Sequence, residues 1–273
     1  MKKILITGAS GFVGLHVLNR LSLGENEISA IVRPHSAAKI DGIHAVKIVE
    51  SEALFFEREE WWIKVLSGID TVIHLAWYAE PGMYLNSDKN LDCLAGTLTM
   101  AKAAAKAGVR RFVGIGTCFE YDVSVGKLSV DSPLKPLTPY AAAKASTYLT
   151  LSQWFGSQSV EFSWCRLFYL YGKGENERRF VPYLRKSLAA GVPAELTSGV
   201  QIRDFLEIEE AAKVICGVAY GGPFGAVNIC SGIPITIRAF AERIADEYGR
   251  RDLLKFGARK DNEFDPPVVV GII

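Results

Sequence analysis

Two side chains in the stretch LTPYAAAKAS are of the types that exchange a proton with a substrate oxygen. Tyr140 and Lys144 are four residues apart, and Thr138 and Pro139 suit the N-cap and first position of a helix. Residues at that spacing lie on one helix face, which predicts that the phenol and the ammonium are neighbours. A phenol titrates near pH ~10, and a neighbouring ammonium lowers that pKa. The pair predicts general acid-base catalysis, although Y-x-x-x-K alone is also a common surface pair.

A hydroxyl follows the apolar stretch RRFVGIG at residues 110–116. Thr117 would stand at the carboxyl end of that predicted strand. There it could orient a carbonyl oxygen toward Tyr140. The alternative is a strand-end hydroxyl that only satisfies the local backbone.

Three glycines near the N-terminus predict a binding site for a dinucleotide. Gly8, Gly11 and Gly14 lie in TGASGFVG, between a β-branched run and a helix-like stretch. Bare backbone lets a pyrophosphate approach, and the following helix points free N–H groups and its positive dipole end at the anion. The glycines could instead only ease a tight turn. Their place at the first strand–helix junction of a βαβ pattern favours nucleotide binding, with the spacing G-x-x-G-x-x-G.

The predicted second strand ends in Ile31-Val32-Arg33, beside the expected adenosine ribose. An acidic residue there would bind the 2′-hydroxyl of NAD, whereas an arginine suits a 2′-phosphate. Arg33 could also be a solvated loop residue. The sequence therefore favours NADP(H) as the cofactor, with NAD(H) as the alternative.

These residues are positioned by an alternating pattern of strands and helices over the first two-thirds of the chain. Helices near 12–23, 56–67, 88–107 and 139–156 separate apolar strands near 3–7, 28–33, 44–49, 71–76, 110–116 and 160–167. Strands that are apolar throughout, with helices between them, predict a parallel sheet covered on both faces. Right-handed crossovers make this an α/β, doubly wound sheet of the Rossmann type, with its ligand at the carboxyl ends of the strands.

Beyond residue 168 the pattern loosens. We expect helices near 178–190, 207–220 and 236–249 and strands near 202–206 and 226–230. The predicted division is a cofactor domain over 1–168 and a smaller, mainly substrate-binding region over 169–273. About 205–232 of that region would return to the first domain. The chain stops after VVVGII with no closing helix, which leaves open whether it is truncated at the C-terminus.

Composition excludes several classes of protein. The 273 residues carry a formal charge of +1, which gives no reason to expect a nucleic acid or an anionic membrane as partner. We see no membrane-length apolar run and no signal peptide. Five cysteines show neither CxxC nor metal-ligand spacing, which predicts reduced thiols in a cytoplasmic protein without a metal site.

The chain resembles the extended short-chain dehydrogenase/reductase superfamily, specifically the NAD-dependent epimerase/dehydratase family that acts on nucleotide sugars. The matching stretches occur in family order and are TGASGFVG, DTVIHLAW, GIGTCFEYD, YAAAK, RLFYLYGKGE, RDFLEIEEAA and NICSG. The resemblance implies that Tyr140 is the acid-base residue, that Lys144 binds the cofactor ribose and that Thr117 polarises the substrate. It also implies a homodimer through the 88–107 and 139–156 helices.

Further binding residues follow from the same resemblance. It implies that the backbone around Phe12, Val13 and Ala76 lines the cofactor. Arg203, in the R-D-F segment, would grip the substrate diphosphate, for which a guanidinium is the right shape. A solvated strand arginine is the alternative. Cys118 and Tyr169 are expected beside Thr117 in the substrate pocket.

Three departures from the family pattern narrow the activity. Cys118-Phe119 replaces the Asp-Glu pair that drives loss of water in family dehydratases, which argues against a 4,6-dehydratase. Cys93 stands where the family often has a relay Asn, with Asn90 one turn earlier. Tyr169 replaces a sugar-contacting Asn, which indicates an altered pocket.

The sequence therefore predicts an NADPH-dependent reductase of a nucleotide-activated 4-keto-6-deoxyhexose. An NAD-dependent nucleotide-sugar 4-epimerase uses the same parts and stays open. A non-catalytic NADP-binding regulator is the third reading, and an intact set of Thr117, Tyr140 and Lys144 argues against it.

Overall fold

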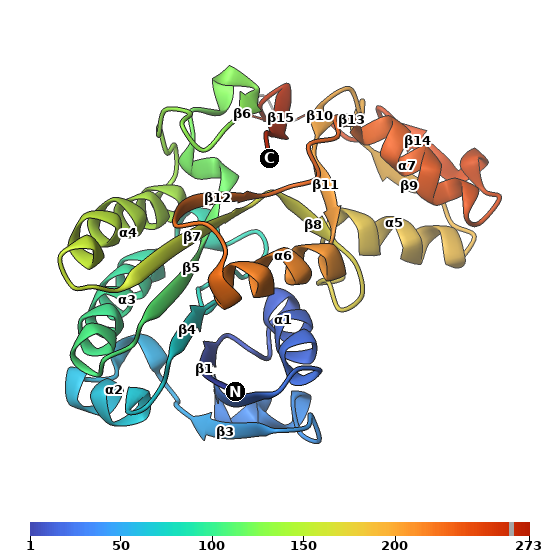
Figure 1. The fold of residues 1–273 in the computed structure, drawn as a ribbon. Helices are drawn as coiled ribbons and strands as arrows, with labels where there is room; N and C mark the ends of the chain where they lie inside the picture. The colour runs from blue at the N-terminus through green and yellow to red at the C-terminus, as the bar shows by residue number, and fades with distance from the viewer. Residues whose placement is uncertain (262–264) are drawn as a thin grey trace.

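A seven-stranded parallel sheet is the centre of the computed structural model, which describes residues 1–261 and 265–273 (Figure 1). Its strands are β1 (Lys2–Thr7), β2 (Asn26–Val32), β3 (Val46–Glu50), β4 (Thr71–His74), β5 (Arg111–Thr117), β7 (Glu161–Leu167) and β12 (Gly225–Ile229). They are hydrogen-bonded in the order β12-β7-β5-β4-β1-β2-β3, and every neighbouring pair is parallel.

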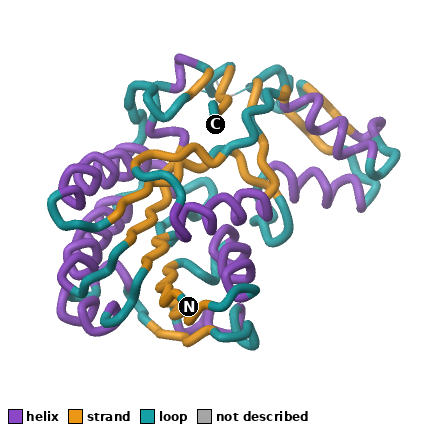
Figure 2. Tube along the Cα trace, in the orientation of Figure 1, coloured by secondary structure: helices purple, strands orange, loops and turns teal. Residues whose placement is uncertain are grey.

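Helices cover both faces of this sheet (Figure 2). One face carries α1 (Phe12–Ser22) and α6 (Ile208–Gly221), and the other carries α2 (Glu59–Leu66), α3 (Lys89–Lys106) and α4 (Pro139–Gly156). The alternation of side chains along β1 explains why both faces are apolar: Ile4 and Ile6 enter the core under α1 and α6, while Leu5 enters the opposite core. The predicted doubly wound α/β fold is confirmed.

The order of the strands creates a crevice beside β1. The chain moves outward from β1 to β2 and β3, and then crosses back to β4 on the other side of β1. Thr7 pairs with His74 at the carboxyl ends of these two strands, and Thr117 ends the next strand. Ligands of open α/β sheets bind at such a reversal, so the fold places the glycine turn and Thr117 at one edge.

A smaller lobe extends from the sheet and has its own core (Figure 1). It contains α5 (Phe180–Ala189), α7 (Ile237–Asp246) and the parallel pair β9 (Ala194–Leu196) and β14 (Leu254–Phe256). Phe205 and Phe240 stack within it at 4.0 Å between ring centroids. Since α6 and β12 belong to the main sheet, the chain returns there between parts of this lobe. The predicted boundary near residue 168 stays a prediction.

Two further groups of short strands join the lobe to the sheet. The strands β8 (Tyr169–Tyr171) and β11 (Phe205–Glu207) are parallel to each other. A four-stranded sheet has the order β13 (Ile235–Thr236), β10 (Ile202–Arg203), β15 (Val268–Gly271) and β6 (Lys127–Leu128).

The single strand predicted over 202–206 was wrong, because Asp204 divides it. Its buried carboxylate accepts hydrogen bonds from the backbone N–H groups of Ser231, Gly232 and Gly271 and from the Ser231 hydroxyl, at 2.6–3.1 Å. The residues before and after Asp204 therefore pair in different sheets. The predicted helix over 56–67 begins at Glu59 instead, because residues 54–56 form a separate 3₁₀ turn.

No helix in the described residues is long and apolar enough to cross a membrane. All five cysteines lie buried with free thiols. Within residues 1–261 and 265–273, no cluster of three or more His, Cys, Asp or Glu side chains could hold a metal ion.

Candidate functional site

The three glycines of the first turn are under different constraints. Gly8 has a φ of +71°, and a Cβ there would lie 2.7 Å from the backbone nitrogen of Ala76. A Cβ on Gly14 would lie 2.0 Å from the Gly8 carbonyl oxygen. A Cβ on the exposed Gly11 would meet only that same oxygen, at 3.3 Å. The fold itself thus requires Gly8 and Gly14, whereas the bare backbone of Gly11 faces outward.

A continuous series of hydrogen bonds holds this turn against the end of β4. The Thr97 hydroxyl donates to the Cys93 carbonyl at 2.7 Å, so its oxygen accepts from His74 Nε2 at 2.9 Å. His74 Nδ1 then accepts from the Thr7 hydroxyl at 2.8 Å, and the Thr7 oxygen accepts from the Ala76 N–H at 3.2 Å. Burial lowers the pKa of His74 to about 3, and the Lys144 charge adds to this effect. His74 is therefore a neutral spacer that fixes the backbone on both sides of the crevice.

These features fit a dinucleotide. Gly11 is the N-cap of α1 and has no side-chain cap, so the first N–H groups of that helix, at Phe12 and Val13, are available to an anion. Arg33 lies exposed at the end of β2, where the sequence predicts it beside the ribose.

The predicted catalytic residues meet at the carboxyl end of β5. Thr138 caps α4 by accepting from the Ala141 N–H at 3.2 Å, which sets the first turn that carries Tyr140. The Thr117 oxygen accepts from the Phe119 N–H at 3.3 Å, and the hydroxyl lies near enough to the Tyr140 phenol to lower its pKa. The ring of Tyr84 packs edge-on against Tyr140, with 4.8 Å between centroids.

Lys144 occupies a buried position between aromatic rings. Its ammonium donates to the Ile115 carbonyl at 2.5 Å and lies 3.8 Å from the centre of the Trp77 ring and 5.6 Å from that of Trp164. Burial lowers the pKa of Lys144 to about 7, and the charge of Glu120 opposes that shift. A cation over an indole face is attracted by the ring quadrupole, which partly replaces lost water.

The structure corrects the expectation that Lys144 lowers the pKa of the Tyr140 phenol. Burial raises the pKa of Tyr140, and the neighbouring Tyr84 and Glu120 raise it further, whereas the Thr117 hydroxyl lowers it. Lys144 does not offset these effects, because its ammonium is directed to the Ile115 carbonyl and is itself desolvated.

The residues expected at the substrate lie on one side of Thr117. Cys118 is buried, which raises the pKa of its thiol to about 12, so it is a neutral side chain. The buried Tyr169 hydroxyl has no hydrogen-bond partner within the described residues. The Arg203 guanidinium lies 5.4 Å from the Tyr169 ring and forms an ion pair of 2.7 Å with Asp265. Arg203 is only 1% exposed, so it is less accessible than the sequence predicts.

Sequence reasoning missed the residues that support Lys144. Trp77 donates to the Asn90 side chain at 2.9 Å, and the Asn90 amide in turn donates to the carbonyls of Tyr84 and Ser87. Asn90 is thus committed to the loop rather than to Lys144. The only signal in the sequence was the aromatic stretch WYAEPGMY directly after β4.

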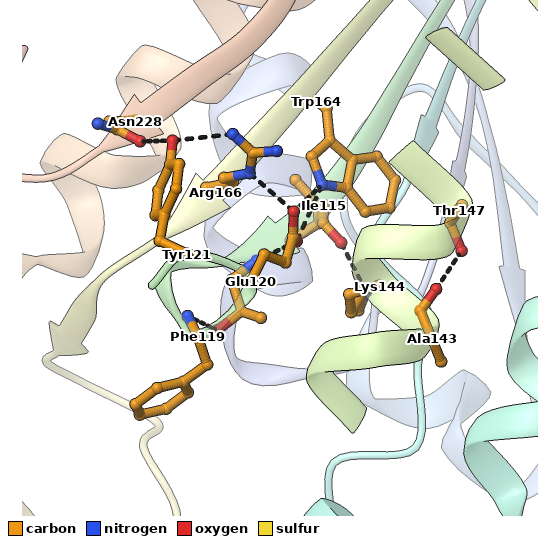
Figure 3. A network of polar contacts seen from close by, with 11 residues as sticks. Ile115, Phe119, Glu120, Tyr121, Ala143, Lys144, Thr147, Trp164, Arg166 and Asn228 are labelled. Carbon is orange, nitrogen blue, oxygen red and sulfur yellow. Dashed lines mark hydrogen bonds and ion pairs between the residues drawn. The ribbon is translucent and has the colours of Figure 1, made fainter. Parts of the chain in front are cut away.

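A buried ion pair behind Thr117 was missed as well (Figure 3). Glu120 and Arg166 meet at 2.7 Å with both side chains almost fully buried. Trp164 donates to the same carboxylate at 3.0 Å. An acidic residue three positions after Thr117 and an arginine within an apolar strand could have pointed to this pair.

The sheet, its reversal at β1 and the glycine turn are those of a Rossmann-like fold. The model of the NAD dependent epimerase/dehydratase family matches residues 4–230, and the chain belongs to this family. It is an enzyme of the extended short-chain dehydrogenase/reductase type.

Three comparisons illustrate the relationship. The chain is 24% identical to the dTDP-6-deoxy-L-talose 4-dehydrogenase (NAD(+)) of Aggregatibacter actinomycetemcomitans, over 98% of both chains. Its fold is similar to the UDP-N-acetylglucosamine 4-epimerase of Methanobrevibacter ruminantium, with a TM-score of 0.87 and 22% identity over 100% of this chain and 89% of the other. It is also similar to the dTDP-glucose 4,6-dehydratase DesIV of Streptomyces venezuelae, solved with NAD bound, with a TM-score of 0.83 and 21% identity over 99% and 88%.

Proposed function

We propose that this enzyme reduces the keto group of a nucleotide-activated 4-keto-6-deoxyhexose with NADPH. The observation that carries the proposal is that α4 brings Tyr140 beside Thr117 and Lys144 onto the Ile115 carbonyl, both at the carboxyl end of β5. The 4-dehydrogenase relative supports the proposal, because the similarity extends over 98% of both chains. Its name describes oxidation at C4 of a 6-deoxy sugar, which is the reverse of the reduction proposed here.

The residues of this chain would act on the sugar oxygen. The Thr117 oxygen accepts from the Phe119 N–H, which leaves its O–H to donate either to the Tyr140 oxygen or to a substrate carbonyl oxygen. Tyr140 supplies the proton that turns that oxygen into a hydroxyl. Its raised pKa keeps the phenol protonated at neutral pH, which suits a proton donor. When bound at the glycine turn, NADPH would supply the hydride.

Loss of water from the sugar is not supported by the residues around Thr117. Cys118 is a neutral thiol, Phe119 has no ionisable group, and Glu120 is fully buried against Arg166. A 4,6-dehydratase needs an acid and a base that reach the sugar.

A 4-epimerase is the second candidate, and the fold of the epimerase from Methanobrevibacter ruminantium favours it. An epimerase oxidises and then re-reduces one carbon with the same residues, and it retains its cofactor. The exposed Arg33 at the end of β2 favours NADPH, which a reductase consumes in each turnover.

One experiment separates the two candidates. Purified enzyme is mixed with NADPH and a dTDP-4-keto-6-deoxyhexose, and the loss of the reduced-nicotinamide absorbance is followed. Stoichiometric loss supports the reductase. No loss, together with tightly retained NAD and isomerisation of a UDP-sugar, would establish the epimerase instead.

The Tyr140→Phe variant tests the role of the phenol. It should lower turnover by a factor of at least ~100, the usual contribution of a general acid, while NADPH binds as before. Retained turnover would remove Tyr140 from the mechanism. We further propose a homodimer, because the expected interface helices α3 and α4 expose Leu91 and Leu149.

A further inference from the structure

The carboxylate of Glu120 is held in one position by donors alone. It accepts from the Thr117 N–H at 2.8 Å, from Trp164 Nε1 at 3.0 and 3.1 Å and from Arg166 Nε at 2.7 Å (Figure 3). Glu120 is 0% exposed. A protonated carboxyl would need an acceptor for its own hydrogen, and these partners offer none. Burial raises the pKa of Glu120, whereas Arg166 and the other donors oppose that shift, and the lack of an acceptor for a carboxyl hydrogen favours the ionised carboxylate.

The arginine of this pair is fixed from its other side. Arg166 Nη1 donates to the Tyr121 hydroxyl at 2.9 Å, and that hydroxyl donates to Asn228 Oδ1 at 2.7 Å. Asn228 in turn donates to the carbonyls of Leu128 and Ile272. The Glu120 carboxylate is thus anchored, directly or through Arg166, to the four strands β5, β6, β7 and β12 and to the C-terminal segment, which is more support than a local cap requires.

The same carboxylate faces the catalytic residues. Its bond to the Thr117 N–H fixes the backbone that carries the proposed substrate-orienting hydroxyl. The indole that donates to Glu120 also lies 5.6 Å from the Lys144 ammonium. The other titratable groups around Lys144 are His74 on β4, Cys93 on α3 and Tyr140 on α4; burial keeps His74 neutral and raises the pKa of the Cys93 thiol and of the Tyr140 phenol. Glu120, although paired with Arg166, is therefore the negative charge that these residues place near the ammonium.

We propose that Glu120 is a positioning residue that fixes the Thr117 backbone and supplies the counter-charge that keeps Lys144 an ammonium in a desolvated site. The proposal rests on the proposed function for its consequence in turnover, but the coupling of Glu120 to Lys144 is measurable without it. The charge also holds the Tyr140 proton in place, since a nearby carboxylate opposes ionisation of a phenol.

The Glu120→Gln variant removes the charge and keeps the shape. In the reductase direction both Tyr140 and Lys144 must be protonated, so turnover falls above the pH at which either loses its proton. Without the carboxylate both protons are lost more easily, and the alkaline limb of the pH–rate profile should move by about one unit toward lower pH. A residue that only supports the fold would lower the rate at every pH without moving the limb.

Glu161→Gln is a matched control. Glu161 pairs with the buried Arg111 at 2.7 Å, at the amino ends of β7 and β5 and hence far from the crevice. Its loss should leave the alkaline limb in place. Glu120→Asp retains the charge but shortens the side chain, so it should lower the rate through Thr117 and leave the limb where it is.

A measurement without turnover covers the case in which the proposed substrate is wrong or Glu120→Gln is inactive. Enzyme labelled with ¹³C at lysine Cε is titrated by NMR, and the Lys144→Arg variant assigns the resonance. The Lys144 signal should titrate near the pKa of about 7 and should move to lower pH in Glu120→Gln but not in Glu120→Asp or Glu161→Gln. An unmoved Lys144 titration in folded Glu120→Gln enzyme overturns the proposal. Absence of turnover with every sugar alongside a moved titration overturns only the proposed function.

Discussion

Two alanine variants in the glycine turn can distinguish a glycine that the fold requires from a glycine that cofactor binding requires. Gly14→Ala and Gly11→Ala add the same methyl group three residues apart. At Gly14 the new Cβ would lie 2.0 Å from the Gly8 carbonyl oxygen and 2.8 Å from the Ala9 Cα, and all of these obstacles are backbone. At Gly11 it would meet one oxygen at 3.3 Å, and the φ of −82° is one that alanine adopts readily.

The expected magnitudes differ accordingly. Overpacking of a tight site costs about 1–3 kcal/mol, and a backbone obstacle places Gly14→Ala near the upper end, at about 3 kcal/mol. For a chain of this size that lowers the melting temperature by roughly 6–12 °C. At Gly11 the lower entropy of the unfolded chain contributes about 0.4–1 kcal/mol, and replacing glycine at an N-cap costs about 0.5–1 kcal/mol. The net change for Gly11→Ala is therefore within about 1 kcal/mol.

The assay combines a thermal melt with a cofactor titration. Gly11→Ala should melt like the parent, yet bind NADPH at least about tenfold more weakly, equivalent to about 1.4 kcal/mol, because its methyl group stands where the pyrophosphate approaches. The main effect of Gly14→Ala should be a lower melting temperature. A Gly14→Ala variant that melts with the parent refutes the steric argument. A Gly11→Ala variant with unchanged affinity refutes the assignment of Gly11 to the ligand.

Two further predictions concern His74 and Arg33. The pKa of His74 is lowered from 6.5 to about 3 by burial, so its neutral form stabilises the fold above pH 6.5 and that contribution is lost as the pH falls toward 3. Urea unfolding should show a loss of about 2 kcal/mol between about pH 7 and pH 5 that a His74→Gln variant lacks; equal slopes in the two proteins would contradict the bonding scheme through Thr7 and Thr97. Arg33→Ala should reduce the affinity for NADPH by about tenfold and leave that for NADH unchanged, as measured by fluorescence titration, whereas an equal loss for both would place Arg33 away from the 2′-phosphate.

Much of the main sheet was predictable because its signals are local. The β-branched runs, the glycine turn and the cap at Thr138 each lie within a few neighbouring residues, so the bounds of α1, α3 and α4 agree with prediction to within a residue. The short strands β6, β8, β9 and β14 contain two or three residues each, which is too few to show a period.

The environment of the candidate site was less predictable, because its contacts join residues far apart in the chain. Glu120 meets Arg166 across 46 positions, and Asp204 meets Gly271 across 67. No spacing in the sequence reports such a pair. The expectation that Tyr140 has a lowered pKa was also wrong. It considered the nearby Lys144 amine but not the burial of both groups, which depends on residues elsewhere in the chain.

Asp204 has a consequence for how variants of this enzyme are read. Arg203 and Asp204 are adjacent in the chain. Arg203, which we propose binds the sugar diphosphate, lies over the Tyr169 ring and pairs with Asp265, while Asp204 ties the turn at residues 231–232 to the final strand. Loss of sugar affinity after a substitution of Asp204 would therefore reflect a loosened turn at residues 231–232. Only a substitution of Arg203 would test recognition of the diphosphate itself.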